Sequence, residues 1–146
     1  MNLNIKPSDQ MPLVGVIDPD LNTAGALSTG WISMADFAWI MAVIAAGTLG
    51  SSATLDAKIE EATNSSGGSA QDLSGKAITQ LTQAGTDESD KQAIINVSAE
   101  DLSDGFTHVR LTMTVATASS DSTAMVFGMG ARYQPAADLA SVAEIV

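Results

Sequence analysis

The sequence predicts an all-β protein: an antiparallel β-sandwich or barrel of jelly-roll type, with an extended N-terminal arm and a short C-terminal tail. Three observations support this fold class. Six or seven short segments have strand patterning, loops rich in Gly, Ser and Asp separate them, and helical periodicity is almost absent. A chain of 146 residues is expected to form one domain. We assign residues 1–29 to the arm, 30–134 to the sandwich and 135–146 to the tail.

The arm is predicted from proline content and from a lack of periodicity. Residues 1–29 hold three of the four prolines and show no sustained alternation. An edge strand at 11–17 is compatible with Pro12, because proline is tolerated at sheet edges. An apolar extended arm can either reach a neighbouring subunit or pack on its own domain.

The first half of the sandwich is expected to contain three strands. Residues 31–33 and 37–46 have strand composition, and the continuous apolar run 37–46 predicts a central strand buried on both faces. Residues 52–63 are ambiguous, since Leu55 and Ile59 fit both an alternating strand and one face of a helix. We predict a strand there, because the run lies between two loops and its neighbours are strands.

Shorter elements follow the Gly/Ser loop at 64–69. Residues 76–81 and 92–97 are predicted to be strands, separated by an acidic loop at 85–90. Residues 98–101 begin with a serine and place an acidic residue three positions later, which predicts a single helical turn with a capping box.

The clearest local pattern lies in residues 106–133. Apolar Val109, Leu111, Met113 and Val115 alternate with polar residues, which is typical of a half-buried strand. Residues 118–122 form a short Ser/Asp break before a second strand-like segment at 123–133. The two segments together predict an antiparallel hairpin closed by a loop.

Composition excludes several classes of function. Six basic residues against 17 acidic ones give a formal charge of −11, which repels phosphate backbones and argues against direct nucleic-acid binding. The absence of cysteine excludes disulfides and thiolate chemistry. The apolar run 37–46 is too short for a helix across a bilayer, and the first residues lack a signal-peptide pattern, so no membrane partner is expected.

No constellation of residues predicts catalysis, a cofactor or a metal. His108 is the only histidine, and no Gly-x-Ser-x-Gly motif accompanies it. Residues 18–22 imitate the start of a calcium loop, but Thr23 and Thr29 stand where the loop requires glycine and glutamate. We therefore expect no enzymatic activity and no bound cofactor.

Several segments together resemble small structural proteins of tailed bacteriophages, of the kind encoded next to the major capsid protein. The resemblance covers about residues 20 to 136 and is carried by residues 22–25, 31–34, 55–63, 76–82, 105–111 and 130–136. It implies a capsid decoration, or cement, protein on the outer surface of the virion, bound where subunits of the major capsid protein meet. It also implies self-association, for which we prefer a homotrimer, with a dimer as the alternative.

The apolar residues of the arm and the tail are the candidates for inter-subunit contacts. They are Ile5, Pro7, Met11, Leu13, Leu139, Val142 and Ile145.

Two other functions remain open. A tail-tube or head-completion protein would also be rich in β-structure and free of cysteine. A carbohydrate-binding module would require Trp31, Trp39 and Tyr133 to share one exposed face.

Overall fold

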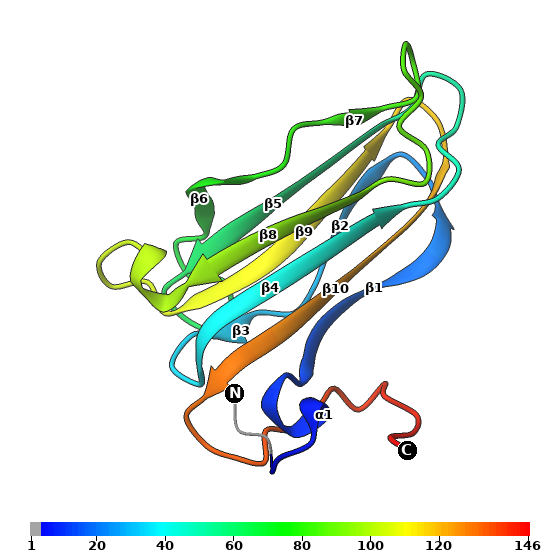
Figure 1. The fold of residues 1–146 in the computed structure, drawn as a ribbon. Coiled ribbons are helices and arrows are strands. Elements are labelled where there is room, and N and C mark those ends of the chain that lie inside the picture. Colours follow the sequence, from blue (N-terminus) through cyan, green and yellow to red (C-terminus); the bar gives the residue numbers. More distant parts are fainter. Residues whose placement is uncertain (1–3) are drawn as a thin grey trace.

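The computed structural model describes residues 4–146 and consists of two antiparallel β-sheets packed face to face (Figure 1). Two short helical pieces, α1 (Pro7–Gln10) and the 3-10 turn η1 (Ala99–Asp101), accompany the strands in this part of the chain. The strands are β1 (Leu13–Asn22), β2 (Gly25–Ser28), β3 (Ile32–Ser33), β4 (Phe37–Ala46), β5 (Thr54–Ala62), β6 (Gln71–Ala77), β7 (Leu81–Thr82), β8 (Gln92–Ser98), β9 (His108–Ala116) and β10 (Ser120–Ala131).

One sheet has four strands in the order β1-β10-β4-β8, and we call it sheet A. The other, sheet B, has the order β2-β9-β5-β6, with β3 also pairing with β9 and β7 with β5. All of these pairings are antiparallel. The predicted all-β antiparallel sandwich is confirmed, and the two sheets do not close into a barrel.

The hydrophobic core lies between the sheets and is built from alternate residues of each strand. Ile40 and Ile44 of β4 face Leu55 and Ile59 of β5, and each of these side chains is at most 1 % exposed. Side chains in a strand point alternately to the two faces, so these residues reach the core while their neighbours face outward. Full burial of one such aliphatic side chain contributes about 1.5–3 kcal/mol.

The N-terminal boundary of the sandwich differs from the one we predicted. β1 pairs with β10 and β2 pairs with β9, so residues 13–28 belong to the sheets and do not form a free arm. The pairing of β1 with β10 shifts register between Leu13 and Gly15 and again between Ile17 and Asp20. These irregularities interrupt the two-residue period, which is why the sequence of this segment does not read as a strand of the sandwich.

The central strand assignments agree with the structure in most respects. Residues 52–63, 92–97 and 98–101 correspond to β5, β8 and η1, and the capping box at Ser98 and Asp101 is present. The segment 76–81 is instead divided between the end of β6 and the start of β7. β4 is interior to sheet A, as predicted, but its outward face is only partly buried.

The predicted hairpin is wrong, because its two strands lie in different sheets. β9 pairs with β2, β3 and β5, whereas β10 pairs with β1 and β4. The connecting residues 117–119 cross from one sheet to the other, and Thr117 adopts a left-handed conformation with φ of 72°. The alternating pattern shows which side chains of each strand face the core. It does not show whether the two strands pair in one sheet or face each other across the core from opposite sheets.

Candidate interaction surfaces

The outward face of sheet A carries apolar side chains on all four strands. Trp39 of β4 is 49 % exposed, Ile94 of β8 is 58 % exposed and Met125 of β10 is 38 % exposed. Other apolar side chains surround these three and are partly exposed. We call the set the apolar face, and its members are Val16, Trp39, Met41, Val43, Ile94, Met125, Phe127 and Met129.

Strand register places these side chains in rows that run across the sheet. Val16 lies opposite Met125, Met125 opposite Val43, and Val43 opposite Ile94, so one row crosses the whole sheet. A second row joins Phe127 to Met41. Side chains opposite each other on neighbouring strands are about 4.5–5.5 Å apart at Cβ and therefore pack into a continuous surface.

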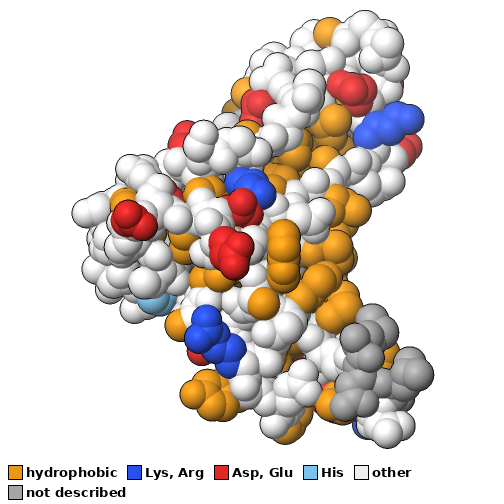
Figure 2. Space-filling model, turned by 60° about the vertical axis from the view of Figure 1, so that its left-hand side comes forward, with side chains coloured by type: hydrophobic (Ala, Val, Ile, Leu, Met, Phe, Trp, Pro, Cys, Tyr) orange, Lys and Arg blue, Asp and Glu red, His pale blue; other side chains and the backbone are white. Residues whose placement is uncertain are grey.

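The apolar face lies on a protein with a net charge of −11, and the outward side of sheet A also carries the polar Gln92, Asn96 and Thr123 and, toward the start of β10, Asp121. In Figure 2 hydrophobic side chains gather in a band on the right-hand side, while most acidic side chains lie to the left of it. A continuous apolar surface is characteristic of a binding surface in a soluble domain.

The outward face of sheet B is charged and internally paired. Glu60 of β5 accepts hydrogen bonds from Arg110 Nε at 2.6 Å and from Thr112 Oγ1 at 2.9 Å. Lys58 Nζ lies 3.6 Å from Glu60 and 2.6 Å from Asp72. We call this set the charged face. These charged groups are paired with one another within the chain.

Trp31 completes the charged face. The Arg110 guanidinium lies 4.6 Å from the centroid of the Trp31 ring, which is a cation–π contact. Gly67 lies against the same indole, and a Cβ at that position would come within 2.8 Å of the Trp31 Nε1 atom. Trp31 is thus held by its own chain and is only partly exposed.

Two neighbouring glutamates of β5 have lowered pKa values. Burial disfavours the charged form of Glu60, but hydrogen bonds from Arg110 and Thr112 and the nearby positive charges outweigh it, so its pKa is lowered. Glu61 is only 1 % exposed and accepts hydrogen bonds from Ser103 N at 2.9 Å, Ser103 Oγ at 2.6 Å and Gln71 Nε2 at 2.7 Å. Burial raises the pKa of Glu61, and these hydrogen bonds lower it further than burial raises it.

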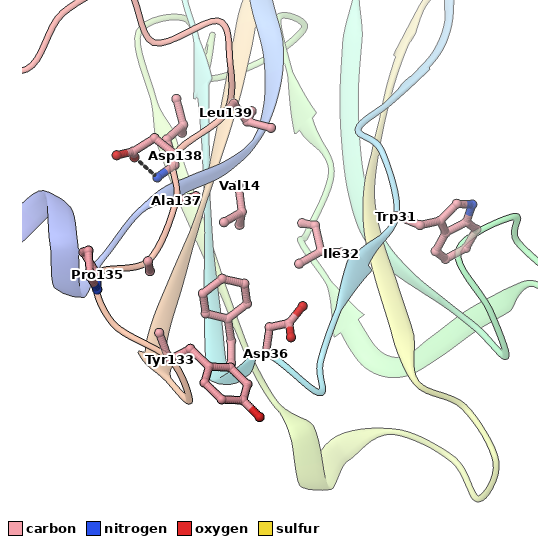
Figure 3. A pocket seen from close by; sticks show the side chains of 13 residues that line it. Val14, Trp31, Ile32, Asp36, Tyr133, Pro135, Ala137, Asp138 and Leu139 are labelled. Carbon is pink, nitrogen blue, oxygen red and sulfur yellow. Dashed lines mark hydrogen bonds between the residues drawn. The ribbon is translucent and has the colours of Figure 1, made fainter.

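A groove of about 380 Å³ opens at the end of the sandwich where the C-terminal tail crosses β1 (Figure 3). Val14 and Ile32 point into it, Tyr133 forms an exposed wall, and Trp31 lies off to one side. Asp36 and Asp138 are the acidic groups in its lining, and Asp138 Oδ1 already accepts a hydrogen bond from Leu13 N at 2.6 Å. The lining offers no nucleophile with an adjacent base.

Two of the predicted inter-subunit residues contact each other within the chain. Leu139 N donates to Leu13 O at 2.9 Å, beside the bond between Leu13 N and Asp138. The tail therefore covers the start of the β1 edge. Ile5 O accepts from Gln10 Nε2 at 2.8 Å, Met11 caps α1, and Val142 N donates to Leu139 O at 3.0 Å. Pro7 at the start of α1 and Ile145 are exposed.

The aromatic residues considered for carbohydrate binding do not share an exposed face. Trp39 lies on the apolar face, whereas Trp31 stacks on Arg110 on the charged face. Tyr133 follows β10 at the end of the sandwich and is 81 % exposed. The condition set for a carbohydrate-binding module is not met, because a planar aromatic platform requires neighbouring rings.

Other residues singled out in the sequence have local roles. His108 Nδ1 lies 2.8 Å from Thr107 Oγ1 at the end of β9. Gly128 accommodates the Phe37 ring of its own chain, since a Cβ at Gly128 would lie 2.5 Å from that ring. Within residues 4–146 no group of three or more His, Asp or Glu side chains could hold a metal ion. No helix in that part of the chain has the length and apolar character needed to span a bilayer.

The apolar face is the feature that the sequence analysis missed. The continuous apolar composition of 37–46 predicts burial on both faces, but no layer formed by residues 4–146 covers the outward side of β4. The available signal was the second apolar set, Trp39, Met41 and Val43, which alternates with the core residues. A strand that is apolar on both faces predicts either an inner layer or a surface covered by a partner.

Comparisons with known proteins identify no family for this chain. No protein-family model and no curated protein matches it. Among solved structures, the chain is similar to one from the structure of infectious bursal disease virus, Gt strain. The two share 10 % sequence identity and a TM-score of 0.44 over 86 % of this chain and 33 % of that chain. This chain thus spans about a third of the length of that one.

Proposed function

We propose that this protein is a structural protein of a virion, and specifically a decoration protein that binds the outer surface of a tailed-phage capsid. The observation that carries the proposal is the apolar face, a continuous set of exposed and partly exposed apolar side chains on a strongly acidic molecule. The resemblance of the sequence to phage structural proteins supplies the class of partner, the major capsid protein. Sheet A faces the capsid in this arrangement, and the charged face of sheet B is directed to solvent.

The energetics of such a contact suit a protein that acts by holding subunits together. A standard interface buries about 800 Å² per partner, and a large aromatic side chain near its centre often dominates the binding energy. Trp39 is the largest side chain of the apolar face. When several copies are linked, each further contact forms at high effective concentration, so dissociation from the shell becomes slow.

The structure of the described residues is compatible with a function that needs no chemistry. The groove beside Tyr133 has no paired nucleophile and base in its lining, and the buried Glu61 is fully engaged by Ser103 and Gln71. A β-sandwich that binds neighbouring capsid subunits through its apolar face can hold them together against the pressure of packaged DNA.

The test is the copy number and location of the protein on purified particles. Quantitative gel analysis and cryo-electron microscopy are expected to find hundreds of copies distributed over the shell, with sheet A against the capsid. A few copies confined to a ring at one vertex would contradict the proposal and support a tail-tube or head-completion protein. Absence from the particles would overturn a virion function altogether.

A further inference from the structure

The free edge of β8 is the one long sheet edge, among those in residues 4–146, whose own strand carries no protective feature. Edge strands of soluble proteins usually carry a proline, a bulge, a charge or a covering segment, which prevents pairing with another chain. β1 carries Pro19 and two register shifts, and the C-terminal tail covers its start. β6 has a register shift and the charged residues Asp72 and Lys76. β2 has only four residues.

β8 has none of these features in its own sequence, Gln92–Ser98, and the Lys76 side chain of β6 reaches its edge at Asn96 O. β8 pairs with β4 over seven consecutive positions without a register shift, and it contains no proline, glycine or charged residue. Segments of this kind, with high strand propensity and no charge, are the ones that add to another sheet.

The backbone groups at the free edge can be assigned from the ladder between β4 and β8. Ala46 N donates to Lys91 O at 2.9 Å, so residues 93, 95 and 97 bond to β4 in the alternating antiparallel pattern. Gln92, Ile94 and Asn96 therefore direct their N–H and C=O groups away from the sheet. The capping bond from Ser98 N to Asp101 at 2.7 Å ends the available stretch.

We infer that two copies of this chain pair through their β8 edges, antiparallel and about a two-fold axis at Ile94. Ile94 then lies opposite Ile94 of the second copy, and Gln92 lies opposite Asn96 at both ends. Each of these opposed pairs exchanges two backbone hydrogen bonds. Lys76 Nζ donates to Asn96 O at 2.9 Å, and that oxygen retains a second lone pair for the partner strand.

Electrostatics favour a second copy of this chain as the occupant. Two molecules with a charge of −11 repel each other over most of their surfaces, and β8 removes charge from the contact. Lys91 precedes the strand and Glu100 follows it, and both are exposed. Acidic residues flank the strand at both ends, with Glu88 and Asp90 before it and Glu100 and Asp101 after it, so the uncharged stretch Gln92–Ser98 is the part of this edge where two copies can approach each other.

Pairing of this kind doubles the apolar face. The row from Val16 through Met125 and Val43 ends at Ile94, which is 58 % exposed because its strand has no neighbour. In the pair, the row continues across the axis into the second copy, and sheet A becomes one eight-stranded sheet. The interaction is isologous, so it produces a closed dimer or a higher assembly built from dimers.

A single introduced cysteine tests this arrangement, because the chain has no cysteine of its own. Opposed residues of a hydrogen-bonded antiparallel pair have Cα atoms about 5.5 Å apart, which is within the range of a disulfide. Oxidised Ile94→Cys is expected to migrate as a covalent dimer at low micromolar concentration. Leu27→Cys, on the exposed edge strand β2 of sheet B, is the matched control and is expected to remain mostly monomeric.

Sedimentation equilibrium of the full chain gives an independent readout. The unmodified protein is expected to dimerise, Ile94→Lys to raise the dimer dissociation constant at least ten-fold, and Leu27→Lys to leave it unchanged. Circular dichroism confirms that each variant is folded. A monomer at all concentrations up to about 100 μM, or an oligomer that Ile94→Lys leaves intact, would overturn the inference. Neither readout involves capsids, so the result does not depend on the proposed function.

Discussion

The two outward faces of the sandwich belong to the same chain and the same fold, yet they differ in what they leave unsatisfied. On sheet B, Glu60 is bonded by Arg110 and Thr112, and Arg110 stacks on Trp31. On sheet A, Trp39 and Met125 expose apolar surface to which nothing in the described chain is opposed. The polar groups of the charged face already have hydrogen-bond and ion-pair partners within the chain. A surface of exposed apolar rows leaves apolar area in contact with water, and this contrast supports the proposal that sheet A is the binding side.

The largest expected effect is a difference in capsid affinity between variants of Trp39 and Trp31. Trp39→Ser is expected to weaken binding to capsids by about 30-fold or more, because loss of a large aromatic anchor costs about 2 kcal/mol or more. Trp31→Ser makes the same substitution on the charged face and is expected to leave capsid affinity unchanged. Co-sedimentation with particles that lack the protein measures both. Equal losses for the two variants would remove the distinction between the faces.

The next effect concerns the stability of the charged face. Glu60→Gln removes the charge that holds Arg110 and Thr112 and is expected to lower the free energy of unfolding by about 1–2 kcal/mol. Urea denaturation followed by fluorescence measures the change. Capsid affinity of this variant should equal that of the unmodified protein, and a parallel loss of binding would assign a contact role to sheet B.

The β5 carboxylates Glu60 and Glu61 are also expected to make the stability of the fold depend on pH. Because the pKa values of Glu60 and Glu61 are lowered in the folded state, the unfolded chain takes up protons first on acidification. Their stabilising contribution is complete above the ordinary glutamate pKa of about 4.3 and is lost as the pH falls through the lowered pKa values. Thermal unfolding between pH 7 and pH 3 is expected to show a smaller acid loss in Glu60→Gln. An identical loss would exclude Glu60 as a contributor.

The smallest effect is expected at the rim of the charged face. Lys58 and Asp72 form a close ion pair, but both side chains are more than a third exposed, and exposed pairs contribute little. Asp72→Asn should change the free energy of unfolding by less than about 0.5 kcal/mol. A change larger than 1 kcal/mol in chemical denaturation would show that this pair supports the β5–β6 edge more strongly than its exposure suggests.

Local patterning predicted individual strands better than their partners. The alternation of Val109, Leu111 and Met113 correctly identified β9 and its buried face, and the apolar run at 37–46 correctly identified an interior strand. The hairpin failed because a short connection joins either neighbouring strands or opposite sheets. Such connections have the same length and similar composition, so only the complete set of strand pairs decides between them.

The proposed binding surface was harder to predict than the fold. Apolar residues in the termini drew attention to Leu13 and Leu139, which bond to each other within the chain. The sequence of β4 did not reveal the apolar face, because its continuous apolar composition also fits a strand that is buried on both faces. Whether Met41 and Val43 face a second layer or a partner depends on the number of layers in the fold, and a single strand sequence does not contain that number.

Radical footprinting of the protein alone and on the capsid tests the central claim most directly, because methionine, tryptophan and histidine report both faces. The account predicts that Trp39 and Met125 of the apolar face lose most of their oxidation on the particle. Trp31 and His108 of sheet B should keep theirs. Protection of Trp31 and His108 with unchanged oxidation of Trp39 and Met125 would contradict the assignment of sheet A as the binding side.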